Sequence, residues 1–564
     1  MKKLFYILCL MTVSVSLMAE QKKDWGRVSA SLESTNHVYV DDKGNDFYPI
    51  AGTEPNLKYL KNRYATNNYL KVDYYKGRIS TGLQVEGYFP TTVGYPLPTS
   101  MLTLSNLYFN WTDDSYSVHA GTFYEQLGSG LLFRSWEDRA LGINNAIVGA
   151  RATYKYEDYF SVKVFGGMPR MGKQSVDAFN FGLAKFPVFD FGFTRTAVAA
   201  ADASVSLSDC FGWERVMLSV EGSFLYKYEN LPDYLTLMGF KSHNIGGSAR
   251  VNFDVDNFYF KGEYVNAGVQ DYLENPENPQ IGNAQLIEIG YNEGGLGVSL
   301  SARRVWAMKQ KVYTANSAGT IEMNNDYDPS VNVLAYCPAL CTQYTYMLAN
   351  LIPYRPRTDG EAGGQIDAFY NFRRGTKIGG KRGMKVHANF STYFNLNDDA
   401  GFKGGAFRMW DFSIDVEKQW TKKFKTTVLY SAQEHNSEEL DWLGNKVKVG
   451  QFHTVVADLL YKWTSTFSTR LELQYLTTKG YQKDWMAALL EVSFAPHWSI
   501  YASDMYNHGS SKMHYYNAGV SYAMRWFRLA AGYGRYRAGF ICSGGVCREI
   551  PAYTGANITL TASF

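Results

Sequence analysis

The 564-residue sequence has no long apolar run after residue 19. A membrane helix needs about 20 consecutive apolar residues, so this absence excludes a bundle of membrane-spanning helices. An excess of charge of one sign is also missing, because 56 Lys and Arg oppose 53 Asp and Glu. This balance gives no support to nucleic-acid binding.

Catalytic motifs are missing as well. The nine histidines are scattered, and the sequence contains no GxSxG, HExxH or Gly-rich phosphate loop. We therefore expect neither an enzyme nor a bound cofactor or metal.

Aromatic residues are what the chain has in abundance. It contains 43 Tyr, 34 Phe and 12 Trp, together with 51 Gly. A disordered chain would contain few aromatics. Apolar and polar residues alternate along most of the sequence, for example over residues 79–89, 249–255 and 384–394, and a period of two places them on opposite faces of a strand. Composition and alternation together predict a large all-β protein.

The first 19 residues have the pattern of a secretory signal peptide. Two lysines precede an apolar stretch over residues 4–17, and Ala19 closes a small-residue cleavage site. Removing residues 1–19 would leave Glu20 as the mature N-terminus and lower the formal net charge from +3 to +1.

Three features separate a membrane barrel from a soluble β-sandwich. The expected strands are long, and a membrane strand needs about 9–11 residues. Their connections alternate between short turns, as at residues 112–115 and 292–295, and longer polar loops, as at 169–188 and 308–361. Aromatics gather at strand ends, and the last alternating strand stops on Phe564, which resembles the terminal signal of outer-membrane barrels.

These features predict a closed antiparallel transmembrane β-barrel in the outer membrane of a Gram-negative bacterium, with short periplasmic turns and long extracellular loops. Counting the alternating segments gives about 24 strands, with 22 or 26 as the neighbouring even numbers that a closed antiparallel barrel allows. The first expected strand covers residues 25–39 and the last covers 553–564, and residues 20–564 form a single domain.

A barrel of this size leaves a lumen, because barrels of about 16 strands or more are too wide for their own side chains to fill. Residues 20–23 are too few to form an N-terminal plug before the first expected strand. We therefore expect a lumen that is open, narrowed by folded-in loops, or occupied by a partner.

The segment 126–142 is the best candidate for an internal constriction, because it gathers charges and a tryptophan between glycines that permit sharp turns. An ordinary surface loop with a solvated charge cluster is the alternative. Arginines left free in a constriction could orient anionic solutes, whereas arginines paired with the nearby acids would be structural. The candidate residues are Arg134, Trp136, Glu137, Asp138 and Arg139.

The cysteines fall into two close pairs and one single residue. In an exported protein, Cys337 with Cys341 and Cys542 with Cys547 are each expected to form a disulfide that staples a loop. A metal site is less well supported, because no histidine is near either pair. Cys210 is expected to be a free thiol.

The segment 128–142 (GSGLLFRSWEDRALG) resembles one in an uncharacterised family of large outer-membrane β-barrels from Bacteroidota. The Tyr-rich composition and the C-terminal Phe are similar too. The resemblance implies an outer-membrane barrel, and it carries over no activity and no functional residue.

Two functions from different classes are compatible with these features. The first is a passive or loosely selective channel for small polar solutes, which a wide polar lumen without a plug would provide. The second is a non-conducting scaffold that anchors or exports a secreted protein or surface lipoprotein, for which the long loop 308–361 would serve. In both cases the expected surroundings are outer-membrane lipid.

Overall fold

The computed structural model describes residues 25–42, 63–95, 101–170, 196–231, 233–237, 241–269, 280–308, 312, 333–396, 404–435, 438–440, 446–448, 450–480 and 482–564. The predicted signal peptide, residues 1–19, lies outside the described residues.

A single sheet of 24 antiparallel strands dominates these residues. The first twelve strands in chain order are β1 (Arg27–Val40), β2 (Tyr64–Lys76), β3 (Ile79–Tyr88), β4 (Met101–Thr112), β5 (Tyr116–Phe123), β10 (Ile147–Tyr156), β11 (Phe160–Pro169), β12 (Ala197–Ser206), β13 (Val216–Tyr228), β14 (His243–Val255), β15 (Phe258–Val269) and β16 (Ile281–Glu293). The other twelve are β17 (Leu296–Trp306), β18 (Gly360–Phe372), β19 (Met384–Leu396), β20 (Gly404–Gln419), β21 (Phe424–His435), β24 (Gln451–Lys462), β25 (Phe467–Thr478), β26 (Trp485–Phe494), β27 (Trp498–Tyr506), β28 (His514–Met524), β29 (Phe527–Tyr536) and β32 (Tyr553–Ser563).

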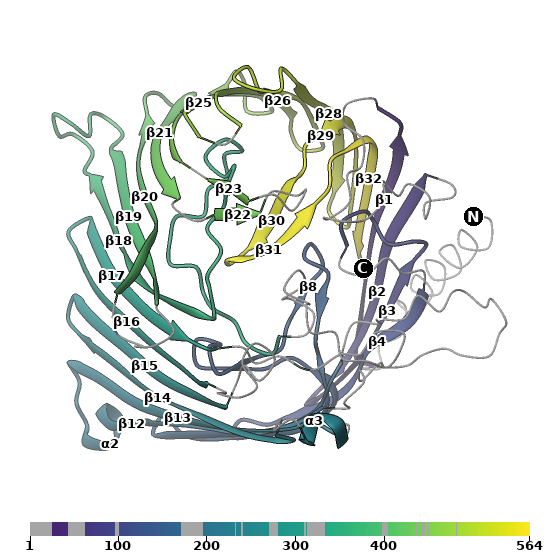
Figure 1. The fold of residues 1–564 in the computed structure, drawn as a ribbon, viewed down its shortest axis with the longest axis vertical. Coiled ribbons are helices and arrows are strands. Elements are labelled where there is room, and N and C mark those ends of the chain that lie inside the picture. Colours follow the sequence, from purple (N-terminus) through teal and green to yellow (C-terminus); the bar gives the residue numbers. More distant parts are fainter. Residues whose placement is uncertain are drawn as a thin grey trace.

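The sheet closes on itself. Each strand pairs with its neighbours in the barrel order, and β1 pairs with β32 over a register that includes Ser34 opposite Leu560. Figure 1 shows the resulting barrel, with the first and last strands side by side. Closure satisfies the backbone hydrogen bonds of both edge strands, which a sheet in hydrocarbon requires. The predicted barrel class and strand number are confirmed.

The outer face of the barrel is apolar because of the period-two alternation. On β25, Leu473 and Tyr475 are each 45% exposed. The alternate residues Glu472 and Gln474 are each only 5% exposed and face the interior. On β14, Ile245 is 58% exposed while Arg250 is 8% exposed. Hydrocarbon can therefore contact the outside, and polar groups line the inside.

Aromatic side chains mark the end of the barrel that carries the short turns. Exposed tryptophans occupy this end at Trp420, Trp463, Trp498 and Trp526. Such residues sit at the membrane–water interface. The helices among the described residues are short, namely α2 (Leu207–Phe211) and α3 (Asp233–Leu237). None in the described part of the chain is both long and apolar enough to cross a membrane.

Many inward side chains are buried in the half of the barrel next to the long connections, and a few, such as Asp73, are buried near the short turns. Inward side chains are buried next to the long connections, as at Ser248 and Arg250 on β14 and at Thr454 and Val456 on β24. On β14, Asp254 lies nearer to the short turn and is partly exposed. We call the half of the barrel next to the long connections the outer half, and the half next to the short turns the periplasmic half. Something within the barrel must cover the wall of the outer half.

Candidate functional site

Several of the described connections at the long-loop end enter the barrel, and three of them contact one another. The first insert, residues 126–146, joins β5 to β10 and contains β6 (Gln126–Leu127), β7 (Phe133–Arg134), β8 (Glu137–Asp138) and β9 (Ile143–Asn144). The second insert is residues 333–358, before β18. The tip hairpin, residues 539–550, consists of β30 (Gly539–Ser543) and β31 (Val546–Ile550). Figure 1 shows β8 and the tip hairpin reaching into the space that the barrel strands enclose.

An apolar cluster fixes the first insert to the wall. Leu127, Leu131, Leu132 and Phe133 are at most 1% exposed, and they pack with wall residues that include Phe165, Val198, Leu225 and Val265. Burial of four such side chains is worth roughly 1.5–3 kcal/mol each. The structure therefore places the segment inside the barrel rather than on its surface.

Glycine lets the insert approach the wall closely. Gly128 has a φ of +54°, and a Cβ at this position would lie 2.1 Å from Glu263 Oε1. The next residue, Ser129, donates its backbone N–H to Glu263 Oε2 at 3.1 Å. Any larger residue at 128 would push the turn away from β15.

Most charges on the first insert are paired. Arg139 Nη1 lies 2.7 Å from Glu33 Oε2 on β1, and its Nε lies 3.4 Å from Glu137 Oε1. Gln84 on β3 donates to Glu137 at 2.8 Å, and Asp138 Oδ1 accepts the backbone N–H of Leu141 at 3.0 Å. These three sequence-predicted residues thus make local structural contacts.

Arg134 differs from Arg139 in its partners. Its guanidinium carbon lies 4.3 Å from the centre of the Trp136 ring and 4.2 Å from that of Tyr336 in the second insert. No carboxylate of the described residues lies within 4.0 Å of it. Arg134 is therefore stabilised by cation–π contacts, which leave its charge uncompensated.

A buried ion pair between Arg170, which follows β11, and Glu86 on β3 also binds the base of the first insert. Arg170 Nη2 lies 2.9 Å from Glu86 Oε2, with both side chains less than a tenth exposed. Asn144 in the insert donates to Glu86 Oε1 at 2.8 Å. Ile143 and Asn144 pair with β8 rather than extending the wall strand β10, and Asn144 thereby reaches the Glu86 carboxylate.

The second insert runs along the inner wall. Tyr393 on β19 donates its hydroxyl to Leu340 O at 2.6 Å, and the backbone N–H of Leu348 donates to Gln474 on β25 at 2.9 Å. An apolar cluster then holds its end, with Leu348, Leu351 and Ile352 packed against Phe452, Leu476, Trp485 and Met505. This insert therefore covers the wall across several strands of the outer half.

One carboxylate anchors the second insert. Glu361 on β18 accepts from Arg303 Nη2 of β17 at 2.5 Å, and it also pairs with Arg408 of β20 and accepts from the hydroxyl of Tyr354. The side chains of Arg303 and Glu361 are 0% exposed. We call these four residues the Glu361 cluster. The two arginines also donate to carbonyl oxygens of the insert, at Pro338 and Arg355.

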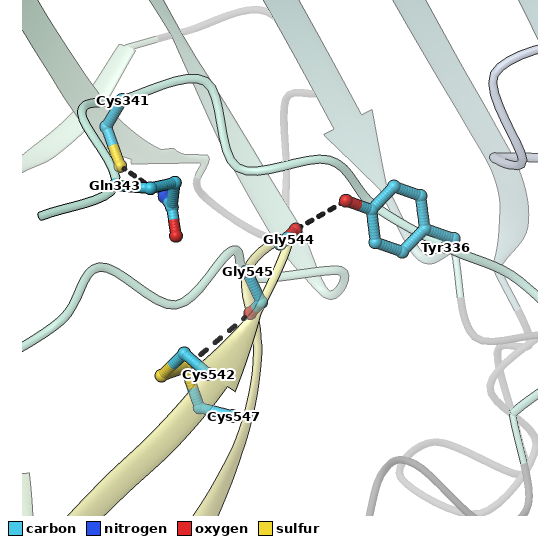
Figure 2. The surroundings of a disulfide bond; sticks show 7 residues. All are labelled: Tyr336, Cys341, Gln343, Cys542, Gly544, Gly545 and Cys547. Carbon is cyan, nitrogen blue, oxygen red and sulfur yellow. Dashed lines mark hydrogen bonds between the residues drawn. A yellow bond between two sulfur atoms is a disulfide. The ribbon is translucent and has the colours of Figure 1, made fainter. Parts of the chain in front are cut away.

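The tip hairpin connects the two inserts. A disulfide joins Cys542 to Cys547 across it. At its turn, Gly544 O accepts from the Tyr336 hydroxyl at 2.6 Å and from the backbone N–H of Ala339 at 3.3 Å, as Figure 2 shows for Tyr336. On the other side, Arg548 donates to Ala140 O of the first insert at 2.8 Å. The three segments are therefore linked to one another inside the barrel.

The expected staple between Cys337 and Cys341 is not formed. Both thiols are free in the structure. Cys337 packs against the apolar cluster of the first insert, whereas Cys341 lies in a separate cluster with Tyr354, Tyr393 and Met409. The wall holds the two thiols in different apolar surroundings, which short sequence spacing alone did not reveal. Cys210 on α2 is a free, exposed thiol.

The sequence pointed to the first insert but not to the residues that anchor the second insert. Arg303, Glu361 and Arg408 lie in ordinary alternating strands, and only the inward register of these positions could have drawn attention to them. Within the described residues, no group of three or more His, Cys, Asp or Glu side chains is placed to hold a metal ion.

A closed barrel with an apolar outer face, aromatic ends and a polar interior is an outer-membrane protein. The chain belongs to the family of unknown function DUF6029, whose model matches residues 1–564. No curated protein matches its sequence.

Solved structures that match this chain include a translocation pore, a siderophore receptor and OccK3. The P pilus usher (PapC) translocation pore matches at 8% identity and a TM-score of 0.40, over 95% of this chain and 99% of that one. The siderophore receptor PirA from Pseudomonas aeruginosa matches at 8% identity and a TM-score of 0.38, over 96% of this chain and 82% of that one. OccK3 (OpdO) from Pseudomonas aeruginosa matches at 11% identity and a TM-score of 0.37, over 80% of this chain and 95% of that one. At these identities and TM-scores, no activity is carried over to this chain.

Replacing Glu361 tests the anchor. Glu361→Gln leaves Arg303 and Arg408 without their buried counter-charge, and removing one partner of a buried pair costs about 3–5 kcal/mol. We expect the second insert to detach more often, so trypsin should cleave the purified barrel after Arg357 faster than in the wild type. The matched control is Glu417→Gln, because its pair with Lys425 is partly exposed and worth about 0–1 kcal/mol. Equal cleavage of both variants would show that Glu361 does not hold the insert.

Thiol labelling tests the cysteine assignment. Burial raises the pKa of Cys337 to about 11 and raises the pKa of Cys341 as well, so at pH 7.5 both are protonated and unreactive. We expect a maleimide to modify only Cys210 in the folded, unreduced protein. In the Cys210→Ala variant, unfolding without reductant should expose two reactive thiols. Labelling that appears only after reduction would show that Cys337 and Cys341 are paired.

Proposed function

We propose that this protein is a channel for small polar solutes, with a fixed constriction in the outer half of its lumen. The observation that carries the proposal is the paired arrangement of charges where the inserts meet the wall. Groups bound in this way hold the constriction in one shape, and they leave a polar surface for a solute to pass. The periplasmic half, whose inward side chains are partly exposed, would form a wider vestibule.

Three clusters support a fixed constriction. Arg139 with Glu33, Arg170 with Glu86 and Arg303 with Glu361 each join an arginine to a wall carboxylate. Glu361 also pairs with Arg408, and Arg139 also pairs with Glu137, so across the three clusters four arginines face four carboxylates and the net field is small. Selectivity by size and polarity is therefore the expected behaviour. The assignment of the family to Bacteroidota stays a prediction from the segment 128–142.

Conductance of the purified, refolded barrel in a planar bilayer tests the proposal. The test variant replaces residues 537–552, which include the tip hairpin, by a two-residue hairpin turn, which β29 and β32 permit because Tyr536 pairs directly with Tyr553. We expect steady conductance from the wild type and a several-fold larger conductance from the variant. The variant removes the contacts of the tip hairpin with both inserts.

Two outcomes would overturn the proposal. Conductance that appears only in the variant would make the tip hairpin a closed gate rather than part of an open constriction. Silence in both proteins would mean a filled lumen, and it would favour the non-conducting scaffold for a secreted protein or lipoprotein. Pull-down from native membranes would then identify that partner.

A further inference from the structure

We propose that Arg134 makes this constriction selective for small organic anions that carry a carboxylate or phosphate group. This inference rests on the proposed channel function and names its preferred class of solute. It concerns Arg134, the arginine of the first insert that has no carboxylate partner among the described residues.

Local strand geometry turns Arg134 away from the wall. In the β6–β7 ladder, Leu127 pairs with Phe133 and Gln126 pairs with Arg134. Leu127 and Phe133 are buried in the apolar cluster against the wall. Neighbouring residues on a strand point to opposite faces, so Gln126 and Arg134 face the lumen. Gln126 is exposed and Arg134 is partly exposed, as this placement requires.

Two aromatic rings hold the guanidinium without using up its donors. The rings of Trp136 and Tyr336 are 6.1 Å apart and inclined at 65°, so Arg134 lies in the corner between them. Tyr336 is itself fixed by its hydrogen bond to Gly544 O. Apart from Tyr336, no described residue accepts a hydrogen bond from the guanidinium, and none of its nitrogens is buried without a partner. The remaining N–H groups therefore face solvent in a planar fork that suits a carboxylate or phosphate.

The surroundings on the Gln126 side add positive charge. Arg151 and Lys163 share the single carboxylate of Glu125, at 2.5 and 2.7 Å. Lys163 also donates to the backbone oxygen of Gln126, the ladder partner of Arg134, at 3.3 Å. Two cations and one anion beside Gln126 leave an excess of one positive charge on this side of the turn, while Glu263 contacts the turn at Ser129. An anion is attracted to such a site, whereas a cation is repelled.

Arg139 in the same insert has a structural role. Its guanidinium donates to Glu33, Glu137 and Gln84. The contrast between Arg134 and Arg139 assigns recognition to the first and anchoring to the second.

The zero-current potential across a planar bilayer tests this assignment. It is measured under a gradient of potassium gluconate, and separately under a gradient of potassium chloride, for the wild type and for Arg134→Gln. We expect the wild type to favour the anion. The variant should lose about fivefold in the anion-to-potassium permeability ratio, the effect of one charge acting over about 4 Å in water. Arg134→Lys should keep most of the preference for chloride, because it keeps the charge, but should lose more of the preference for gluconate, because it lacks the planar fork.

Two comparisons keep the result interpretable. Arg215→Gln removes an arginine that is 79% exposed at a short turn, so its permeability ratio should stay at the wild-type value. Arg134→Gln must run as a folded barrel on an unheated gel, and Arg134→Lys provides the second variant if it does not. Conductance with an unchanged ratio in Arg134→Gln would overturn the role of Arg134 and leave the channel standing. Absence of any conductance would instead overturn the channel itself.

Discussion

The buried carboxylate of Glu361 holds the interior of this barrel together. It sits between arginines of β17 and β20 and is completely removed from solvent. Two buried arginines would be costly without it, since an uncompensated charge in a dry site loses several kcal/mol of hydration. The same arginines donate to carbonyl oxygens of the second insert, so the ion cluster and the insert depend on one another.

The need for such anchors follows from the size of the barrel. Closing 24 strands satisfies every edge but leaves an interior too wide for wall side chains to fill. Polar groups on the inner wall of the outer half are buried only because the inserts cover them. The first insert uses an apolar cluster and Glu86 for this purpose, and the second uses Glu361 and the cluster around Trp485. The tip hairpin then fastens both through Gly544 and Arg548.

The barrel could be predicted from sequence because its cause is local. The alternation along each strand predicts which side chains contact lipid, and the short turns predict which strands are neighbours. The interior depends on contacts between distant residues, such as Arg303 with Glu361, or Arg139 with Glu33, which are 106 positions apart. No local pattern marks such pairs. Residues 134–139 drew attention through their composition, yet only their partners distinguish Arg134 from Arg139. The predicted disulfide between Cys337 and Cys341 is absent for the same reason, because contacts with the wall rather than the sequence spacing decide where each thiol lies.

Hydrogen–deuterium exchange of the purified barrel tests the central claim most directly. The claim is that the three inserts form one fixed constriction inside the barrel. Backbone bonds between inserts, such as Arg134 N–H to Leu334 O at 2.9 Å and Tyr336 N–H to Gly130 O at 2.8 Å, should then exchange as slowly as those of the wall strands. Exchange of residues 126–146, 333–358 and 539–550 at the rate of an unstructured peptide would contradict the account.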